Sequence, residues 1–218
     1  MIPTSINNVL EKAKSERDSA VIHIAQKRPI LVMDNDTFSK LIILKCERIF
    51  IDRNEPKKFI LTDSNKKLIN YLHLFSTANK DFPGSIYKGI HIWGDFGTGK
   101  TTLMMAFREI IMENTGKNIT MILAKNLGSN ILEKTMNHYV RMPLFLDDIG
   151  REMKEIKDFG NIYKPVPDLY YLRKEHGSWT FQTCQKAIDD LEPLYGLFIT
   201  SRMHAMFNEF HLEGKCMR

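Results

Sequence analysis

The sequence has few cysteines and no long hydrophobic run, and each scarcity excludes a class of protein. Its three cysteines, Cys46, Cys184 and Cys216, are odd in number, lie far apart and form no C-x-x-C pair. This pattern indicates neither a zinc site nor a disulfide framework, so we expect reduced thiols in a cytoplasmic protein. No apolar run approaches the roughly 18–20 residues of a membrane-spanning helix, and the polar N-terminus is not typical of a signal peptide.

Charge of one sign does not gather in blocks, and the histidines are scattered along the chain. The 31 lysines and arginines against 26 acids give a formal net charge of +5. Basic residues occur in pairs, for example at 27–28, 57–58 and 66–67, as they do on an ordinary solvated surface. The small excess of positive charge mildly favours an anionic partner, either nucleic acid or a nucleotide.

The most informative stretch of the chain runs from Ile90 to Phe107. A short apolar run ends at a glycine-rich loop of the pattern G-x-x-x-x-G-K-T, and apolar residues at helical spacing follow. Strand, loop and helix in this order are typical of a phosphate-binding loop, in which successive backbone N–H groups point at one anion. The alternative is a glycine-rich turn before an ordinary helix. The residues that we expect to bind the nucleotide are Gly94, Asp95, Phe96, Gly97, Thr98, Gly99, Lys100, Thr101 and Thr102.

Two side chains of this loop have specific expected roles. Lys100 would reach the β- and γ-phosphates, which makes it a candidate catalytic residue. The Thr101 hydroxyl would hold Mg²⁺. The sequence therefore predicts a bound nucleoside triphosphate with its metal ion.

A second nucleotide-binding signal is the run LFLDDIG at 144–150. An apolar strand would deliver Asp147 to the carboxyl edge of a sheet, beside the phosphate loop, where it can hold Mg²⁺ through water. Asp148 occupies the position at which many ATPases carry a glutamate that polarises the attacking water, and Glu152 is a second candidate. Two acids after an apolar strand could also form a cap or an exposed turn, but their place downstream of the phosphate loop favours the metal site.

Two further polar residues are candidates for catalysis. Gln185 closes the triplet that follows the next expected strand and could contact the γ-phosphate or the nucleophilic water, although an ordinary strand end is the alternative. Arg202 could be an arginine finger that neutralises charge on a phosphoryl group held by a neighbouring subunit. Spacing alone favours an ordinary surface arginine at that position.

Strands that alternate with helices predict an α/β fold with a doubly wound, mainly parallel sheet. The 218 residues, of which 43% are hydrophobic, suffice for one such domain with a modest N-terminal extension. The expected strands are 90–93, 119–124, 143–148 and 179–183. Three expected helices begin at Ser5, at Asp36 or Thr37, and at Asp63 or Ser64. Another helix directly follows the phosphate loop. The remaining expected helices lie in 130–139, 151–159, 168–174, 188–195 and 202–207. Short apolar runs at 48–51 and 59–61 flank a turn.

Together these motifs resemble the DnaC-type helicase loaders, a branch of the AAA+ ATPases that also includes the IstB-type transposition helpers. The matching segments are GDFGTGKTTLM, LFLDDIGRE, DFGN at 158–161, TFQTCQ, LEPLYGLFITSRMHAMFN and the closing LEGKCMR. The resemblance covers roughly residues 59–218. It implies a three-layer P-loop NTPase of the AAA+ ASCE type with a parallel sheet, a short helical N-terminal extension at 1–58, and little or no C-terminal lid.

The resemblance also implies a function. ATP and Mg²⁺ would be the cofactors, and the protein would assemble as a homo-oligomer on single-stranded DNA and deliver a replicative helicase. Arg202 matches the family's arginine finger, and Arg218 is a candidate for a basic residue that closes the domain. Gln185 falls where the family carries a sensor asparagine, and Phe198 replaces a common arginine. These departures favour slow hydrolysis, with ATP acting mainly as a binding switch.

The sequence leaves several functions open. The first is a helicase loader, encoded by a phage or mobile element, whose residues before about Phe59 bind the helicase. The second is an IstB-like helper that marks target DNA for a transposase. The third is a nucleotide-dependent binding module with negligible turnover. A P-loop kinase for a small molecule is a distant fourth, because no substrate lid is apparent.

Overall fold

The computed structural model describes residues 11–12, 14–15, 28–158 and 160–214. Of the helix expected from Ser5, the structure describes only residues 11 and 12, which are helical, while Cys216 and Arg218 lie outside the described residues. The core of the structure is a five-stranded sheet in the order β2-β3-β6-β1-β7, in which every neighbouring pair is parallel. Its strands are β1 (Gly89–Trp93), β2 (Thr120–Leu123), β3 (Leu144–Asp147), β6 (Thr180–Cys184) and β7 (Phe207–His211).

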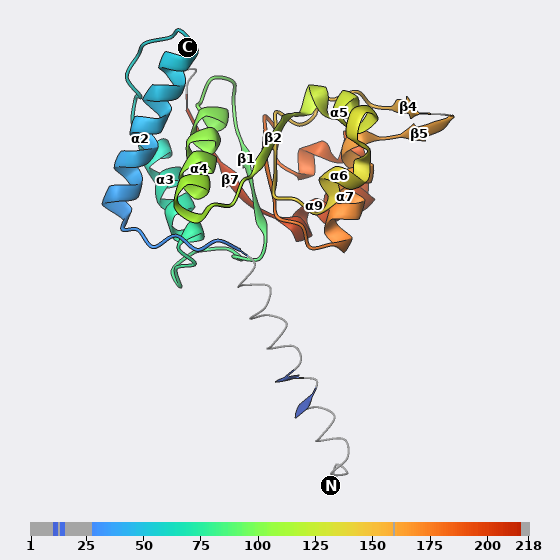
Figure 1. The fold of residues 1–218 in the computed structure, drawn as a ribbon, viewed down its shortest axis with the longest axis horizontal. Coiled ribbons are helices and arrows are strands. Elements are labelled where there is room, and N and C mark those ends of the chain that lie inside the picture. The colour runs from blue at the N-terminus through green and yellow to red at the C-terminus, as the bar shows by residue number, and fades with distance from the viewer. Residues whose placement is uncertain (1–10, 13, 16–27, 159, 215–218) are drawn as a thin grey trace.

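Helices cover both faces of this sheet, which confirms the three-layer α/β fold (Figure 1). One face carries α2 (Asn35–Asp52), α3 (Asp63–Ser76) and α4 (Lys100–Thr115). The other carries α5 (Leu127–Lys134), α6 (Met136–Val140), α7 (Pro165–Glu175) and α9 (Leu197–Met206). Short turns η1 (Ala124–Asn126) and η2 (Asp189–Leu191) and the short helix α8 (Glu192–Tyr195) complete the connections. Each helical layer buries its own apolar cluster against the sheet.

Helix α2 packs on the sheet domain as part of the same core. Its N-cap is Asp34, whose carboxylate accepts a hydrogen bond from the backbone N–H of Thr37. Its buried residues recur at helical spacing and join the apolar cluster that α3, α4 and β1 form, and the aromatic ring of Phe38 meets that of Phe107 in α4. The apolar run at 48–51 therefore continues α2 and is not a separate element.

One sequence-based prediction of secondary structure is wrong, a second is correct except at one residue, and one strand was missed. The helix expected in 151–159 is replaced by an antiparallel hairpin of β4 (Ile156–Asp158) and β5 (Asn161–Tyr163), because Gly160, with φ of +86°, closes a tight turn there. The helix expected at 130–139 is two helices, since Thr135 has φ of +66° and breaks the hydrogen-bonded ladder. Strand β7 was not foreseen. None of the helices in the described part of the chain is long and apolar enough to cross a membrane.

Candidate nucleotide-binding site

The glycine-rich loop between β1 and α4 has the backbone conformation that its glycines allow. Gly94, Gly97 and Gly99 have φ values of +146°, +72° and +95°, which side-chain-bearing residues rarely adopt. A Cβ atom at Gly94 would overlap the carbonyl oxygen of Leu212. Gly99 precedes α4, and no side chain caps this helix. The loop therefore turns tightly and leaves the first N–H groups of a 16-residue helix available to an anion.

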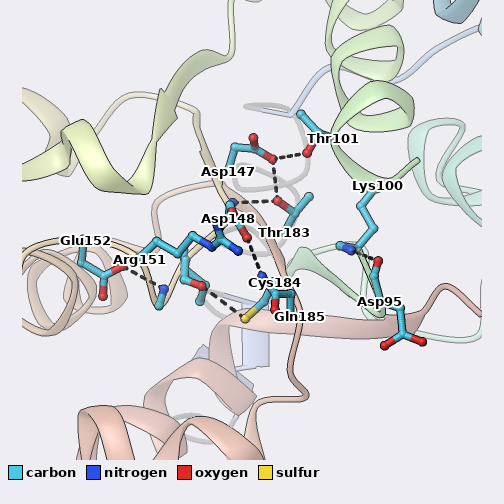
Figure 2. A network of polar contacts seen from close by, with 12 residues as sticks. Asp95, Lys100, Thr101, Asp147, Asp148, Arg151, Glu152, Thr183, Cys184 and Gln185 are labelled. Carbon is cyan, nitrogen blue, oxygen red and sulfur yellow. Dashed lines mark hydrogen bonds and ion pairs between the residues drawn. The ribbon is translucent and has the colours of Figure 1, made fainter. Parts of the chain in front are cut away.

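Lys100 lies within this loop and is 9% exposed. Its ammonium donates hydrogen bonds of 2.7 Å to the carbonyl oxygens of Gly94 and Asp95, and the Thr98 hydroxyl donates to the latter at 2.9 Å. Burial lowers the pKa of Lys100, while the negative charge of the nearby Asp148 acts in the opposite direction. The lysine is thus a desolvated cation at the floor of the loop, where its interaction with a phosphate would be strong (Figure 2).

Asp147 and Thr101 bring two oxygen ligands together from different elements. Asp147 ends β3 and is 4% exposed, and its Oδ1 accepts hydrogen bonds from the hydroxyls of Thr101, at 2.7 Å, and Thr183, at 2.6 Å (Figure 2). A carboxylate beside a hydroxyl fits Mg²⁺, which binds oxygen ligands and keeps several waters. Among the residues that the structure describes, no group of three or more His, Cys, Asp or Glu side chains could hold a metal ion. One carboxylate and one hydroxyl fill only part of an octahedral shell, so the remaining ligands of a bound Mg²⁺ would be phosphate oxygens and water.

Asp148 has an unusual backbone and several partners. Its φ is +60°, and its N–H donates to the Thr183 hydroxyl at 2.9 Å. Its carboxylate forms an ion pair with Arg151, with Nε 2.9 Å from Oδ2, and accepts a 3.5 Å hydrogen bond from the Gln185 amide. The sequence-predicted residues Lys100, Asp147, Asp148 and Gln185 are therefore brought to one edge of the sheet, and all four line the same cavity.

The Thr183 hydroxyl connects the two acids, and the sequence did not single out this role. It donates to the Asp147 carboxylate and accepts from the Asp148 N–H, so it fixes both residues at the end of β3. Only the pairing of β3 with β6 brings it there, because Leu146 lies opposite Gln182 in the register of the sheet. A polar residue at the end of the neighbouring strand is the sole sequence signal that could have identified it.

We expect Thr183→Val to destabilise the fold by about 1–3 kcal/mol, because it leaves the buried Asp147 carboxylate and the partly buried Asp148 N–H each short of one partner. Chemical denaturation followed by circular dichroism measures this difference in the free energy of unfolding. Thr183→Ser is the matched control, since it retains the hydroxyl and loses only a methyl group. Equal stability of the Val and Ser variants would show that the hydroxyl holds nothing in place.

A cavity of about 630 Å³ extends from the phosphate loop toward the end of α2. Its volume is within the range of small-ligand pockets, on the order of 300–1,000 Å³. At the far end the rings of Phe50 and Phe59 stack with centroids 6.4 Å apart, and the Lys57 ammonium lies 4.8 Å above the Phe50 ring. Phe50 and Lys57 belong to the part of the chain that sequence reasoning treated as an extension, and Phe59 is the first residue of the expected ATPase domain. The aromatic surface of the two phenylalanine rings suits a nucleobase. Nothing in the sequence pattern of these apolar residues indicates that they would contact one.

Two candidates do not face this cavity. Glu152 is held by the Gly150 N–H at 2.8 Å and by the Tyr195 hydroxyl, away from the acid pair (Figure 2). Arg202 lies on α9, where its guanidinium is 3.8 Å from the centroid of the Phe198 ring, 4.9 Å from that of Tyr171, and within 3.6 Å of a Glu175 carboxylate oxygen. Arg202 therefore has no contact with the phosphate loop of its own chain, and a role in a neighbouring subunit's site stays a prediction.

A buried chain of hydrogen bonds supports the segment that carries Gln185. The His91 Nε2–H donates to the carbonyl oxygen of Lys186 at 2.9 Å, and this leaves Nδ1 to accept from the Gln182 amide at 2.6 Å. The Gln182 carbonyl oxygen in turn accepts from the Tyr170 hydroxyl. Each group has one consistent role, so the network fixes a neutral imidazole beside the site.

A fall in pH should therefore lower the free energy of unfolding, and His91 is the residue responsible. Burial lowers the pKa of His91 from 6.5 to about 4, so the neutral imidazole is favoured in the folded state. This contribution is fully present above pH 6.5 and is lost as the pH falls to about 4. The loss is on the order of 3 kcal/mol. Denaturation across this pH range measures it, and His91→Gln should remove this part of the pH dependence. An unchanged slope in that variant would assign the effect to other groups.

Comparison with known proteins supports the fold. No protein-family model matches the chain, and no curated protein matches it significantly. Among solved structures, a candidate primosome component from Streptococcus pyogenes serotype M3 is 18% identical, with a TM-score of 0.58 over 89% of this chain and 97% of that one. A DnaC helicase loader is 19% identical, with a TM-score of 0.57 over 71% of this chain and 93% of that one.

A third similar structure is the replication initiator DnaA bound to AMPPCP and single-stranded DNA. It is 18% identical, with a TM-score of 0.52 over 72% of this chain and 49% of that one. At these identities the similarity establishes the fold. The chain thus shares the α/β fold of these three structures, as the sequence resemblance implied.

Proposed function

We propose that this protein is a Mg²⁺-dependent ATPase of the helicase-loader type that acts in DNA replication. The observation that carries the nucleotide site is the pair formed by the Thr101 hydroxyl and the Asp147 carboxylate, 2.7 Å apart beside a phosphate loop with its desolvated lysine. Lys100 and the loop N–H groups would hold the phosphates. Thr101 and Asp147 would hold Mg²⁺, which neutralises charge on the phosphate oxygens when bound.

The hydrolytic step would rest on Asp148 and Gln185. Both line the cavity and contact each other at 3.5 Å. The Asp148 carboxylate would orient the attacking water by accepting its hydrogen bond, and the Gln185 amide would fix that carboxylate or the water itself. Water adds to the terminal phosphorus as the bond to the bridging oxygen breaks, which yields ADP and inorganic phosphate.

Assembly would complete the site. We expect Arg202 of one subunit to reach the phosphates bound to a neighbour, so that the homo-oligomer forms on single-stranded DNA in an ATP-dependent manner. Residues 1–58 would contact a replicative helicase. The fold that the chain shares with a DnaC helicase loader and with a DnaA structure containing single-stranded DNA supports this assignment, as does its net charge of +5.

A loading assay tests this proposal. The protein is mixed with the replicative helicase of its host and with single-stranded DNA, with and without ATP, and the helicase bound to DNA is measured. We expect ATP-dependent loading by the wild type and none by Lys100→Ala. Absence of any helicase interaction in either nucleotide state would contradict the loader assignment while leaving the nucleotide site intact.

One observation favours a second function, a nucleotide-dependent switch with negligible turnover. The Asp148 carboxylate is paired with Arg151 at 2.9 Å, and a carboxylate oxygen held by a guanidinium is less free to accept a hydrogen bond from the attacking water. Steady-state hydrolysis in the presence of single-stranded DNA separates the two functions. Turnover that disappears in Lys100→Ala supports the ATPase, and tight ATP binding without turnover supports the switch.

A further inference from the structure

Arg151 is a cation at the phosphate end of the cavity to which the sequence motifs assigned no role. It follows β3 by a short loop and reaches back toward the acid pair, where its Nε lies 2.9 Å from the Asp148 carboxylate (Figure 2). Its guanidinium also lies 4.8 Å above the ring of Phe96, a residue of the phosphate loop. Arg151 thus bridges the two halves of the candidate nucleotide site, the phosphate loop and the end of β3.

The surroundings of Arg151 leave it able to change partner. Its side chain is 49% exposed, that of Asp148 is 36% exposed, and Phe96 is 53% exposed. Exposed ion pairs and exposed cation–π contacts contribute little to stability, because water competes for both groups. By contrast, Lys100 is buried and held by two loop carbonyls. The cavity therefore has one fixed cation and one movable cation near the place where phosphates would lie.

We propose that Arg151 binds the terminal phosphate of the nucleotide in its own subunit and thereby selects a triphosphate over a diphosphate. The inference rests on the proposed nucleotide site and adds a specificity-determining residue to it. A guanidinium offers a planar fork of donors that matches phosphate oxygens and can bind them through two parallel hydrogen bonds, whereas an exposed ion pair contributes little. Arg151 would exchange Asp148 for the γ-phosphate, with the Phe96 ring supporting the guanidinium in both arrangements.

The exchange has a consequence for Asp148. Once Arg151 moves to the phosphate, the Asp148 carboxylate loses the cation that neutralises it and becomes available to orient water. Only a ligand with a third phosphate would free it. Arg151 would then both distinguish a triphosphate from a diphosphate and determine whether the Asp148 carboxylate can orient the attacking water.

Isothermal titration calorimetry of the full chain tests the proposal with Mg²⁺ present. The ligands are AMPPCP, a triphosphate analogue that is not hydrolysed, and ADP. We expect Arg151→Gln to weaken AMPPCP binding by about tenfold, the effect of losing one charge-assisted contact, and ADP binding by less than about twofold. Arg151→Lys should recover part of the loss, because it restores the charge without the fork. Arg141→Gln, at an exposed arginine outside the cavity, is the control and should leave the AMPPCP-to-ADP ratio unchanged.

Equal weakening of both ligands by Arg151→Gln, or no weakening of either, would overturn the proposal even if the wild type binds ATP normally. A wild type that binds neither ligand would overturn the proposed nucleotide site together with it. These variants should fold normally, because half of the Arg151 side chain is in solvent and the partners that it contacts within the described residues, Asp148 and Phe96, are at the cavity edge. Circular dichroism spectra of the variants that match the wild-type spectrum would confirm that the variants are folded.

Discussion

Asp147→Asn should lower ATP turnover by about a hundredfold or more and abolish the dependence of nucleotide binding on Mg²⁺. The substitution keeps the size of the side chain and an oxygen that can still accept from Thr101 and Thr183. It removes the negative charge that a metal ion requires, and the loss of one electrostatic contact to a reacting group costs on the order of 10²–10³ in rate. Steady-state phosphate release and nucleotide titration, each with Mg²⁺ or EDTA, measure the two effects.

Two other acids serve as controls for this experiment. Asp148→Asn should also slow hydrolysis, but nucleotide binding should keep its dependence on Mg²⁺, because Asp148 contacts Arg151 and Gln185 and not Thr101. Asp190→Asn changes an exposed acid outside the cavity and should change neither property. Binding by Asp147→Asn that still depends on Mg²⁺ as in the wild type would place the metal ligand elsewhere.

Gly89→Ala should cost about 3 kcal/mol or more of the free energy of unfolding, or prevent folding. Gly89 begins β1 in the middle of the sheet, and a Cβ atom there would overlap the backbone carbonyl oxygen of Thr180 in β6. Backbone atoms of a central strand cannot move aside as a flexible side chain can, so the overlap must be relieved by separating the strands. Urea denaturation and the yield of folded protein measure the effect.

Gly116→Ala distinguishes this steric effect from the general cost of replacing a glycine. Gly116 has φ of +68° at the end of α4, and a Cβ there would meet nothing within 4 Å. Its substitution should cost only about 1–2 kcal/mol, the strain of a left-handed residue. If the two variants are equally stable, the close approach of β1 to β6 at Gly89 does not constrain the sheet.

Much of the architecture follows from the sequence because its determinants are local. The apolar run before the glycine loop, the helix after it and the strand before the acids have strong patterns, and parallel strands place their carboxyl ends at one edge. Lys100, Thr101, Asp147 and Asp148 were therefore expected to meet, and they lie together. Their roles in binding and catalysis stay predictions.

The features that the sequence did not reveal depend on contacts between distant segments. Thr183 reaches the acid pair only through the register of β6 on β3, and Phe50 reaches the cavity only through the packing of α2 on α4. Apolar and polar residues do not alternate clearly along Phe207–His211, so the sequence did not predict strand β7, and its parallel pairing with β1 decides its conformation. Arg151 lies in a loop, where neither periodicity nor a motif indicates which side chain faces the site.

Nucleotide binding by the full-length protein tests the central claim most directly. Calorimetric titration with AMPPCP, in Mg²⁺ and in EDTA, measures whether the phosphate loop and the Thr101–Asp147 pair act as one metal–nucleotide site. We expect saturable binding at one site per chain, tighter in Mg²⁺ than in EDTA, and lost in Lys100→Ala. Absence of binding by the wild type, or equal binding by the wild type and Lys100→Ala, would contradict the account.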